Sequence, residues 1–460
     1  MDSTNPELAQ DFSPLIKIYK DGRVERLIST EIVPPSFDPE TNVECKDTLY
    51  SLEHNLSVRL YLPKNTHQNQ KLPLLVYFRG GGFVVGTVFA PINHNYLNIL
   101  VSEANIIAVS VDYRNAPEHP LPAAFNDSWS ALRWVASHFN QKGPEDWLNC
   151  YADFQRVFFS GDSAGGNIAH QMAIKHGHEE KLEGLNIAGL ILCHPFFWGE
   201  KPIPGESKEE WQRNWIESLW KVVDPSTGGL DDPWINPAYN PNLDRLGCER
   251  VQVFVSEKDP LRERGWYYCL KLRESGWSGD MEVIDYKGEE HVFHLENLTC
   301  ENSVSLRKKI VQFINQVMSS PITYSHNINI LENTDSNSSP LIIEAREELN
   351  YQLCYVDQKR RKKMGEKKKS DLSIVIVIVN IFLWPLSYDL SPSSSSYGLS
   401  PLHLPLPMAS LQRQHLPRRR RCSDRCSSSS SCSSIDAQIC SSISSMLVDL
   451  GLMKMKLALL

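Results

Sequence analysis

The chain has 460 residues and a formal net charge of −8, enough length for one large domain with additional segments or for two domains. Residues 1–320 carry 30 Lys and Arg against 43 Asp and Glu, whereas residues 321–460 carry 17 against 12. The acidic first part argues against nucleic-acid binding, which needs clustered cationic side chains to neutralise phosphates.

Apolar runs typical of strands recur along residues 1–320 and alternate with stretches typical of helices. The expected strands are 58–62, 72–78, 105–113, 156–162, 188–196, 251–259 and 281–286. The expected helices are 123–139, 164–177, 209–220, 263–275 and 301–319. This alternation predicts an α/β fold around a mostly parallel sheet, with the last of these helices ending the domain.

The composition changes after residue 320. A basic block at 359–369 precedes an apolar run of fifteen residues at 372–386, and the chain is then rich in Ser, Pro and Arg. A membrane anchor flanked by basic residues is one interpretation, although fifteen residues are short for a bilayer. We instead expect 321–460 to be a disordered or spurious extension, because this composition cannot bury enough apolar surface to fold.

Cysteine usage and the N-terminal residues bear on location. The six cysteines before residue 321 have neither paired nor metal-binding spacing, and they are Cys45, Cys150, Cys193, Cys248, Cys269 and Cys300. We expect reduced thiols in a cytoplasmic protein. Residues 1–12 are acidic and lack an apolar core, so we expect no secretory signal.

The strongest local motif is GDSAGG at 161–166, which follows the strand-like run RVFFS and precedes a helix-forming stretch. G-x-S-x-G between a strand and a helix predicts a nucleophile elbow, a sharp turn that presents the hydroxyl of Ser163. Glycines flank the serine because side chains would clash in so tight a turn. Ser163 is therefore the candidate nucleophile.

A serine nucleophile needs a base and an acid that orients the base. In α/β folds with a nucleophile elbow, the acid follows the serine along the chain and the histidine follows the acid. Asp259 ends an expected strand, and His291 lies in a loop after the next one. Glu257, Asp285 and His294 fit less well, because they fall within strands or at the start of a helix. The alternatives are that Asp259 is a helix N-cap and that His291 is a structural histidine.

A glycine-rich loop, RGGGF at 79–83, follows the expected strand at 72–78. Acyl transfer creates an oxyanion that backbone N–H groups commonly bind, and in this fold one such group comes from this loop. We expect the amides of Gly81, Gly82 and Ala164 to form the oxyanion hole. A glycine-rich turn without such a role is the alternative.

Together these motifs resemble the plant carboxylesterase family, in the hormone-sensitive-lipase-like branch of the α/β hydrolases. The resemblance covers about residues 10–320 and rests on RGGGF at 79–83, YRNAPEHPLPAAFND at 113–127, GDSAGGN at 161–167, EKDPLRERG at 257–265 and GEEHVFH at 288–294. It implies an α/β-hydrolase domain over 1–320 with an eight-stranded sheet and a small helical cap, the cap from about 1–40 and 200–235. It also implies a cytosolic enzyme whose triad is Ser163, Asp259 and His291.

The family usually has histidine at the position of Arg79, where that side chain supports the oxyanion loop from behind. One interpretation is that Arg79 makes equivalent hydrogen bonds to carbonyls or an acid and that activity survives. A second is that its guanidinium reaches the pocket and binds a carboxylate of the substrate. A third is a damaged loop with weak hydrolysis. Arg79, Phe83 and Trp215 are accordingly candidate substrate contacts.

Two further stretches are expected near the site. The first, 113–127, contains Pro117, Pro120 and Pro122 beside Glu118 and His119, and we expect it to order loops rather than to act chemically. The second, 209–220, puts Trp211, Trp215 and Leu219 on one helical face. That face predicts either an apolar acyl or alcohol pocket within the cap or plain core packing.

We therefore expect a serine carboxylesterase that hydrolyses small carboxylic esters and needs no metal or organic cofactor. The expected partner is a small-molecule ester or related plant metabolite, not nucleic acid or a membrane. One alternative is a lyase or cyclase of plant specialised metabolism, since relatives of this family use the same pocket and triad positions for dehydration or ring formation. Another is a binding protein similar to the gibberellin receptors, in which the triad histidine is replaced, whereas His291 is present here.

Overall fold

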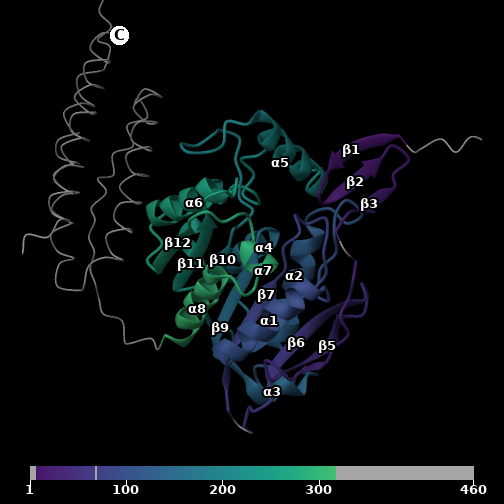
Figure 1. Cartoon of the computed structure of the whole chain (residues 1–460). Helices are drawn as coiled ribbons and strands as arrows, with labels where there is room; N and C mark the ends of the chain where they lie inside the picture. The colour runs from purple at the N-terminus through teal and green to yellow at the C-terminus, as the bar shows by residue number, and fades with distance from the viewer. Residues whose placement is uncertain (1–6, 29, 68–69, 317–460) are drawn as a thin grey trace, which may run out of the picture. The chain divides into compact units, whose positions relative to one another are not determined.

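The computed structural model describes residues 7–28, 30–67 and 70–316 (Figure 1), so the predicted extension at 321–460 lies outside the described residues. Its main sheet has nine strands in the spatial order β12-β11-β10-β9-β7-β8-β6-β5-β4. These strands are β4 (Phe37–Asp38), β5 (Val43–Ser51), β6 (Leu56–Pro63), β7 (Leu72–Phe78), β8 (Ile107–Val111), β9 (Ala152–Asp162), β10 (Ile187–Cys193), β11 (Arg250–Ser256) and β12 (Asp280–Tyr286). The strands from β7 to β12 pair in parallel with one another, whereas β4, β5 and β6 pair antiparallel.

Helices cover both faces of this sheet. The α-helices of the described residues are α1 (Pro91–Ala104), α2 (Ala123–Ala136), α3 (Asp146–Tyr151), α4 (Ala164–Ile174), α5 (Glu210–Val223), α6 (Arg262–Glu274), α7 (Phe293–Glu296) and α8 (Glu301–Asn315). In β7, Leu74, Val76 and Phe78 share a core with α2, α4 and α6, while Leu75 and Tyr77 share a second core with α1 and α8. A strand buried on both faces has no polar side to display, which explains its continuous apolar sequence.

The N-terminal segment forms a separate antiparallel sheet of three strands, β1 (Leu8–Phe12), β2 (Ile16–Tyr19) and β3 (Val24–Arg26). Among the described residues from 7 to 40 the regular elements are strands, whereas a helical cap was expected over about 1–40. Apolar Ile16 and Ile18 flank Lys17, an alternation that suits a strand. The described helix of the other expected cap segment is α5, which lies beside this sheet (Figure 1). The rings of Trp215 and Phe12 meet there edge to face, with their centroids 6.2 Å apart.

The predicted α/β fold is confirmed, with one correction to the strand number. The sheet has nine strands rather than eight, because the two-residue strand β4 pairs with β5 at the edge. The predicted strand at 72–78 coincides with β7, and the predicted helix at 164–177 is α4 followed by a π-helical turn to Glu179. This framework leaves the loops after the parallel strands free to form a site.

Candidate active site

Four loops that follow parallel strands converge at one edge of the sheet. The glycine-rich loop follows β7, Ser163 follows β9, Asp259 follows β11, and His291 follows β12. Because the carboxyl ends of parallel strands lie at the same edge, residues distant in sequence come together there. The structure thus brings together the side chains that the motif order singled out.

Ser163 sits on a strained turn between β9 and α4. Its backbone has φ 52° and ψ −118°, a region that non-glycine residues rarely adopt, and its N–H donates to the Cys193 carbonyl at 2.9 Å. A Cβ added at Gly161 would lie 2.2 Å from the Gly165 carbonyl oxygen, and one added at Gly165 would lie 1.9 Å from the Phe78 carbonyl oxygen. Only glycine fits at both positions, so these two residues allow the elbow to form.

A hydrogen-bonded relay joins the three predicted triad residues. Ser163 Oγ lies 3.0 Å from His291 Nε2, and His291 Nδ1 lies 2.8 Å from Asp259 Oδ2. When Nδ1 carries the proton and donates it to the carboxylate, Nε2 is left as an acceptor for the serine hydroxyl. Asp259 Oδ1 also accepts from the Leu261 N–H at 2.9 Å, so the carboxylate orients the histidine and the start of α6 at once.

Burial and charge act in opposite directions on this pair. Burial of Asp259 favours its neutral form, but the adjacent His291 outweighs this effect and holds the pKa of the carboxyl below its ordinary value. Burial likewise disfavours the imidazolium of His291, but the charge of Asp259 and the hydrogen bond to it raise the pKa of the imidazole. The arrangement therefore stabilises a protonated histidine beside an ionised aspartate.

The weaker candidates for the acid and the base have other partners. Glu257 forms an ion pair with Lys287 at 2.8 Å, and Asp285 forms one with Arg262 at 2.7 Å. His294 is buried in α7, and burial lowers the pKa of its imidazole to about 3. None of the three contacts the serine hydroxyl, in contrast to His291.

Sequence reasoning missed a second histidine behind His291. His194 follows β10 with φ 49°, and its ring lies 5.8 Å from that of His291 and stacks on His294 at 5.5 Å. Burial lowers the pKa of His194 well below its ordinary value, so both inner rings are uncharged. The His194 and His294 rings thus pack on each other as uncharged groups, and the His194 ring lies beside that of His291. The sequence signal for His194 was the His-Pro pair that follows an apolar run.

The glycine-rich loop is built from residues with positive φ. Gly81, Gly82 and Phe83 have φ values of 113°, 59° and 64°. The Gly81 carbonyl accepts hydrogen bonds from the N–H groups of Val84 and Val85, both at 3.0 Å. In a planar trans peptide the N–H points opposite to the C=O, so the Gly82 N–H points away from this turn. An added Cβ at Gly81 would lie 2.1 Å from the Val85 carbonyl oxygen, which excludes larger residues.

Arg79 lies behind this loop and is only 1% exposed. Its guanidinium donates to the carbonyls of Gly80 (3.1 Å), Val85 (2.8 Å) and Tyr113 (3.0 Å), to Asn115 Oδ1 (2.8 Å) and to Asp112 Oδ1 (3.5 Å). These are contacts to carbonyls and an acid, as in the first of the three interpretations of Arg79. The second interpretation needs a guanidinium that faces the pocket, which is not the orientation observed.

Asp162, which precedes Ser163, is a further charged group that the sequence reasoning did not single out. Its carboxylate accepts hydrogen bonds from the Tyr77 hydroxyl and the Gly80 N–H. Burial raises the pKa of Asp162 to about 6, although these donors favour its ionised form. The variable position of the G-x-S-x-G motif, a polar residue next to the nucleophile, was the available signal.

The two aromatic residues predicted to contact substrate lie in different surroundings. Phe83 is buried, and its ring packs within 6.4 Å of the rings of Phe125, Phe196 and Trp220 beneath the loop. Trp215 is half-buried on α5. Phe83 therefore packs the end of the loop into the main core, whereas Trp215 lies where the N-terminal sheet meets α5.

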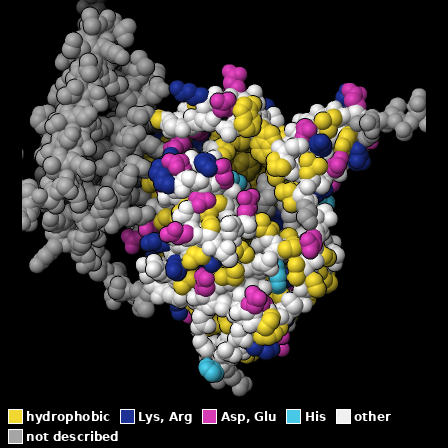
Figure 2. All heavy atoms as spheres, viewed as in Figure 1, with side chains coloured by type: hydrophobic (Ala, Val, Ile, Leu, Met, Phe, Trp, Pro, Cys, Tyr) yellow, Lys and Arg dark blue, Asp and Glu magenta, His cyan; other side chains and the backbone are white. Residues whose placement is uncertain are grey.

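The predicted stripe on α5 is divided between core and surface. Leu219 is buried, whereas Trp211 is 64% exposed. A Cβ added at Gly82 would lie 3.1 Å from Leu15 and 3.4 Å from Leu219, so these side chains cover the glycine-rich loop. Figure 2 shows hydrophobic side chains gathered around a hollow between α5 and the N-terminal strands. The stripe is thus partly core and partly the border of this hollow.

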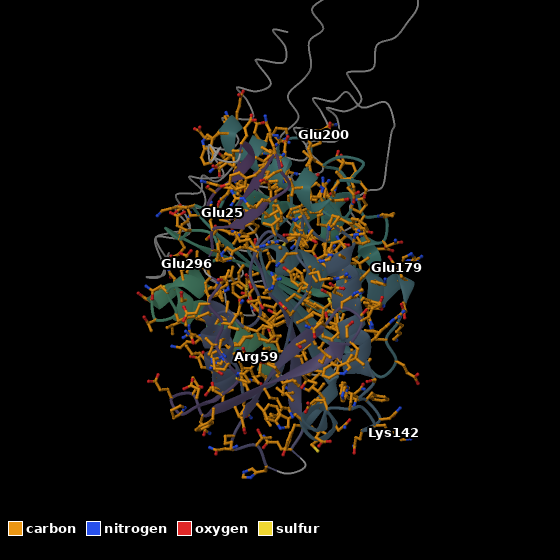
Figure 3. All side chains as sticks on the ribbon, turned by 90° about the vertical axis from the view of Figure 1, so that its right-hand side faces the viewer. Glu25, Arg59, Lys142, Glu179, Glu200 and Glu296 are labelled. Carbon is orange, nitrogen blue, oxygen red and sulfur yellow. The ribbon has the colours of Figure 1, made fainter. Side chains whose placement is uncertain are left out.

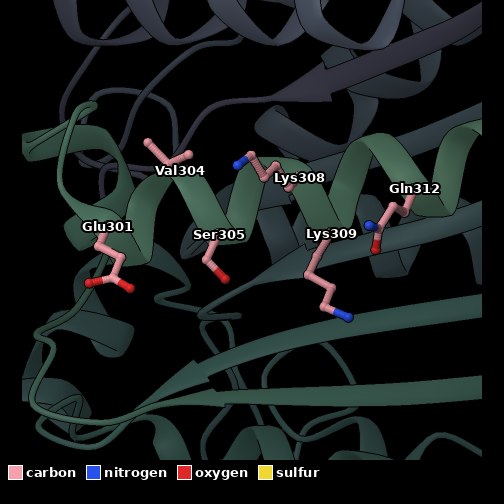
Figure 4. Close-up of a pocket in the computed structure, with 6 residues that line it drawn as sticks. All are labelled: Glu301, Val304, Ser305, Lys308, Lys309 and Gln312. Carbon is pink, nitrogen blue, oxygen red and sulfur yellow. The ribbon is translucent and has the colours of Figure 1, made fainter.

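Two pockets in the described ranges are not lined by the relay residues, one along α8 and one at residues 202–213. The pocket in Figure 4 lies along α8, and its lining residues are Glu301, Val304, Ser305, Lys308, Lys309 and Gln312. Across the described ranges no three His, Cys, Asp or Glu side chains are grouped so that they could hold a metal ion. In the same residues no helix is both long and apolar enough to cross a membrane, and the apolar run at 372–386 lies outside them.

Comparison with known proteins identifies the family. A family model described as the α/β hydrolase fold matches residues 75–295. Probable carboxylesterase 13 of Arabidopsis thaliana is 47% identical over 322 residues, which cover 67% of this chain and 98% of that protein. Probable carboxylesterase 4, mitochondrial, of the same plant is 46% identical over 318 residues, 68% of this chain and 84% of that protein.

A relative named for a different reaction is similar at nearly the same level. The 2-hydroxyisoflavanone dehydratase of Glycyrrhiza echinata is 44% identical over 320 residues, which cover 68% of this chain and 98% of that protein. These matches, together with the fold, confirm the family resemblance drawn from the motifs. The chain belongs to the plant carboxylesterase family of the α/β hydrolases.

Proposed function

We propose that the protein is a serine carboxylesterase that hydrolyses small carboxylic esters. Ser163 Oγ attacks the ester carbonyl carbon while His291 Nε2 accepts the hydroxyl proton, and Asp259 stabilises the resulting imidazolium. His291 then gives this proton to the leaving alcohol, and a water molecule releases the acyl group by the same steps. The observation that carries the proposal is the relay from Ser163 to His291 at 3.0 Å and from His291 to Asp259 at 2.8 Å.

The oxyanion of the tetrahedral intermediate is bound in this proposal by the N–H groups of Gly81, Gly82 and Ala164. Support comes from the carbonyls of Gly80 and Gly81, which are both held by donors within the loop region, so the N–H groups of the same peptide units point the other way. Ala164 is the first residue of α4, where a backbone N–H has no acceptor within the helix. Preorganised donors of this kind commonly contribute the largest part of catalysis in acyl transfer.

Hydrolysis of p-nitrophenyl acetate and butyrate by the full-length protein tests the proposal. Ser163→Ala should lower kcat at least about a thousandfold, because no other group can form the acyl-enzyme. Ser160→Ala is the matched control, since Ser160 is buried in β9, the strand that precedes Ser163, and lies outside the relay. Equal rates for wild type and Ser163→Ala, or no hydrolysis by the folded wild type, would overturn the esterase proposal.

A dehydratase is the second candidate, and the 44% identity to 2-hydroxyisoflavanone dehydratase favours it. Sequence and geometry of the relay suit both reactions, since both move a proton at His291. Incubation with 2-hydroxyisoflavanone and mass analysis of the product distinguishes them: loss of one water at a rate exceeding ester hydrolysis would favour the dehydratase. Ester hydrolysis without such a product would favour the esterase.

We expect a reducing compartment, with the cytoplasm as the proposed location. Cys45, Cys150, Cys193, Cys248 and Cys300 are free thiols, which is usual in such compartments. One relative carries a mitochondrial location in its name. Imaging of a fluorescent fusion of the full chain should give diffuse cytoplasmic signal, and a mitochondrial pattern would contradict the proposal.

A further inference from the structure

We propose that Arg79 is a positioning residue for the oxyanion hole, acting through the peptide unit that joins Gly80 to Gly81. The inference rests on the proposed function and extends it to a residue that does not touch the substrate. It also assigns a role to the arginine that stands where the family usually has histidine.

The first step of the argument is the peptide unit itself. Arg79 Nη1 donates to the Gly80 carbonyl at 3.1 Å, and the N–H of that same unit belongs to Gly81. Because the unit is planar and trans, the Gly81 N–H points away from the guanidinium. A charged donor on the carbonyl polarises the unit and makes its N–H a stronger donor. Arg79 therefore both orients and strengthens a proposed oxyanion donor.

The second step is that the same guanidinium nitrogen ties the far end of the turn. Nη1 also donates to the Val85 carbonyl at 2.8 Å, while the Val85 N–H donates to the Gly81 carbonyl at 3.0 Å. The two ends of the loop are thereby joined through one rigid, planar group. Without it, a turn rich in glycine has many alternative conformations, since glycine has the greatest backbone freedom.

The third step is that Arg79 itself cannot turn toward a substrate. Its five N–H donors face five acceptors, the three carbonyls of Gly80, Val85 and Tyr113, the side-chain oxygen of Asn115, and the carboxylate of Asp112. The guanidinium also stacks on the Tyr113 ring, 3.9 Å from its centroid. A substrate carboxylate would have to displace these partners.

The preceding peptide unit is fixed in a similar way. The Arg79 carbonyl accepts from the Tyr113 hydroxyl at 2.9 Å, and the Gly80 N–H donates to the buried Asp162 carboxylate. A Cβ added at Gly80 would lie 2.3 Å from Asp162 Oδ2, so the contact is close. Two consecutive peptide units are thus held, and Arg79 contributes its carbonyl to the first and a guanidinium hydrogen bond to the second.

The test compares Arg79→Met and Arg79→Lys with Arg59→Lys in the full-length protein. Arg59 is the matched control because it is also 1% exposed, bonds Asp47 on the neighbouring strand at 2.7 Å, and makes no hydrogen bond to residues 80–86. Figure 3 labels Arg59, a residue of β6, in the lower half of the view. Glu25 of β3 and Glu200 are labelled above it. The measurements are kcat and KM for p-nitrophenyl butyrate and the inhibition constant of a trifluoromethyl ketone, whose adduct with a serine carries an oxyanion.

We expect Arg79→Met to lower kcat about 10- to 100-fold and to weaken ketone inhibition by a similar factor, with KM changed less than about twofold. Arg79→Lys, which keeps the charge but reaches fewer carbonyls, should lie between Arg79→Met and wild type. Arg59→Lys should leave kcat and ketone inhibition near the wild-type values. Should Arg79→Met fail to fold, Arg79→Lys decides by the same criteria.

Wild-type kcat and ketone inhibition in the folded Arg79 variants would overturn this inference while leaving the esterase proposal intact. A change confined to KM would also overturn it, because it would assign Arg79 to substrate binding. Absence of Ser163-dependent hydrolysis in the wild type would instead overturn the esterase proposal, and this inference with it.

Discussion

Replacement of Asp162 by asparagine tests the consequence of burying a carboxyl group between the elbow and the glycine-rich loop. Asp162 is 3% exposed, and burial raises its pKa to about 6 from the ordinary 3.8. A carboxyl group with a higher pKa in the folded state binds its proton more tightly there than in the unfolded chain. Its contribution to stability is therefore full at low pH and is lost as the pH rises through the folded pKa.

The size of the effect is set by the two pKa values. At about 1.4 kcal/mol per pKa unit, the difference between 3.8 and about 6 removes about 3 kcal/mol of unfolding free energy at pH 7. At pH 5, where the folded carboxyl is still mostly protonated, the loss is about half as large. Asparagine does not titrate and can still accept a hydrogen bond from the Gly80 N–H, so it carries no such pH-dependent loss.

Urea unfolding of full-length wild type and Asp162→Asn at pH 5 and pH 7 measures this difference. Between pH 5 and pH 7 the unfolding free energy of Asp162→Asn relative to wild type should rise by about 1 kcal/mol. Any constant effect of the substitution on packing or hydrogen bonding cancels in this comparison. A difference that does not change with pH, or that moves toward wild type at pH 7, would refute the reasoning.

Three further predictions concern the site and its surroundings. Ester hydrolysis should fall as the pH drops through the pKa of His291, which Asp259 raises above its ordinary value. A pH profile of kcat/KM should show this loss of activity at a lower pH for Asp259→Asn than for wild type, because the pKa of His291 is then no longer raised. Gly81→Ala should lower kcat at least about 100-fold with an unchanged circular dichroism spectrum, because the new Cβ would lie 2.1 Å from a loop carbonyl; wild-type kcat would contradict the loop assignment. Glu206→Gln should lower the unfolding free energy by about 3 kcal/mol in urea titrations, since it removes the anionic partner of buried Arg264, and an unchanged midpoint would count against that ion pair.

Much of the site was predictable because this fold brings motifs that are distant in sequence close together in space. Parallel strands deliver the loops that follow them to one edge, so the order of the motifs alone leads us to expect that Ser163, Asp259 and His291 meet. The strand at 72–78 could be delimited for a related reason, since burial on both faces requires an uninterrupted apolar run. The local sequence pattern was sufficient to predict a strand where that strand is buried on both faces.

The remaining features depend on contacts between distant residues. The direction of Arg79 is set by Tyr113 and Asn115, which follow a different strand, and nothing local distinguishes a guanidinium behind the loop from one in the pocket. The buried carboxylate of Asp162 likewise depends on Tyr77 from the neighbouring strand. The strands of the N-terminal sheet have only three to five residues each, too few for their alternation to predict them, and β4 has only two residues.

Covalent labelling of Ser163 tests the central proposal most directly. The full-length protein is treated with a fluorophosphonate, which forms a stable adduct with an activated serine, and its peptides are mapped by mass spectrometry beside those of Ser163→Ala and His291→Ala. We predict a single adduct on Ser163 in the wild type, formed in step with the loss of p-nitrophenyl butyrate hydrolysis, and none in either variant. Labelling at another residue, or loss of hydrolysis without modification of Ser163, would contradict the proposed nucleophile.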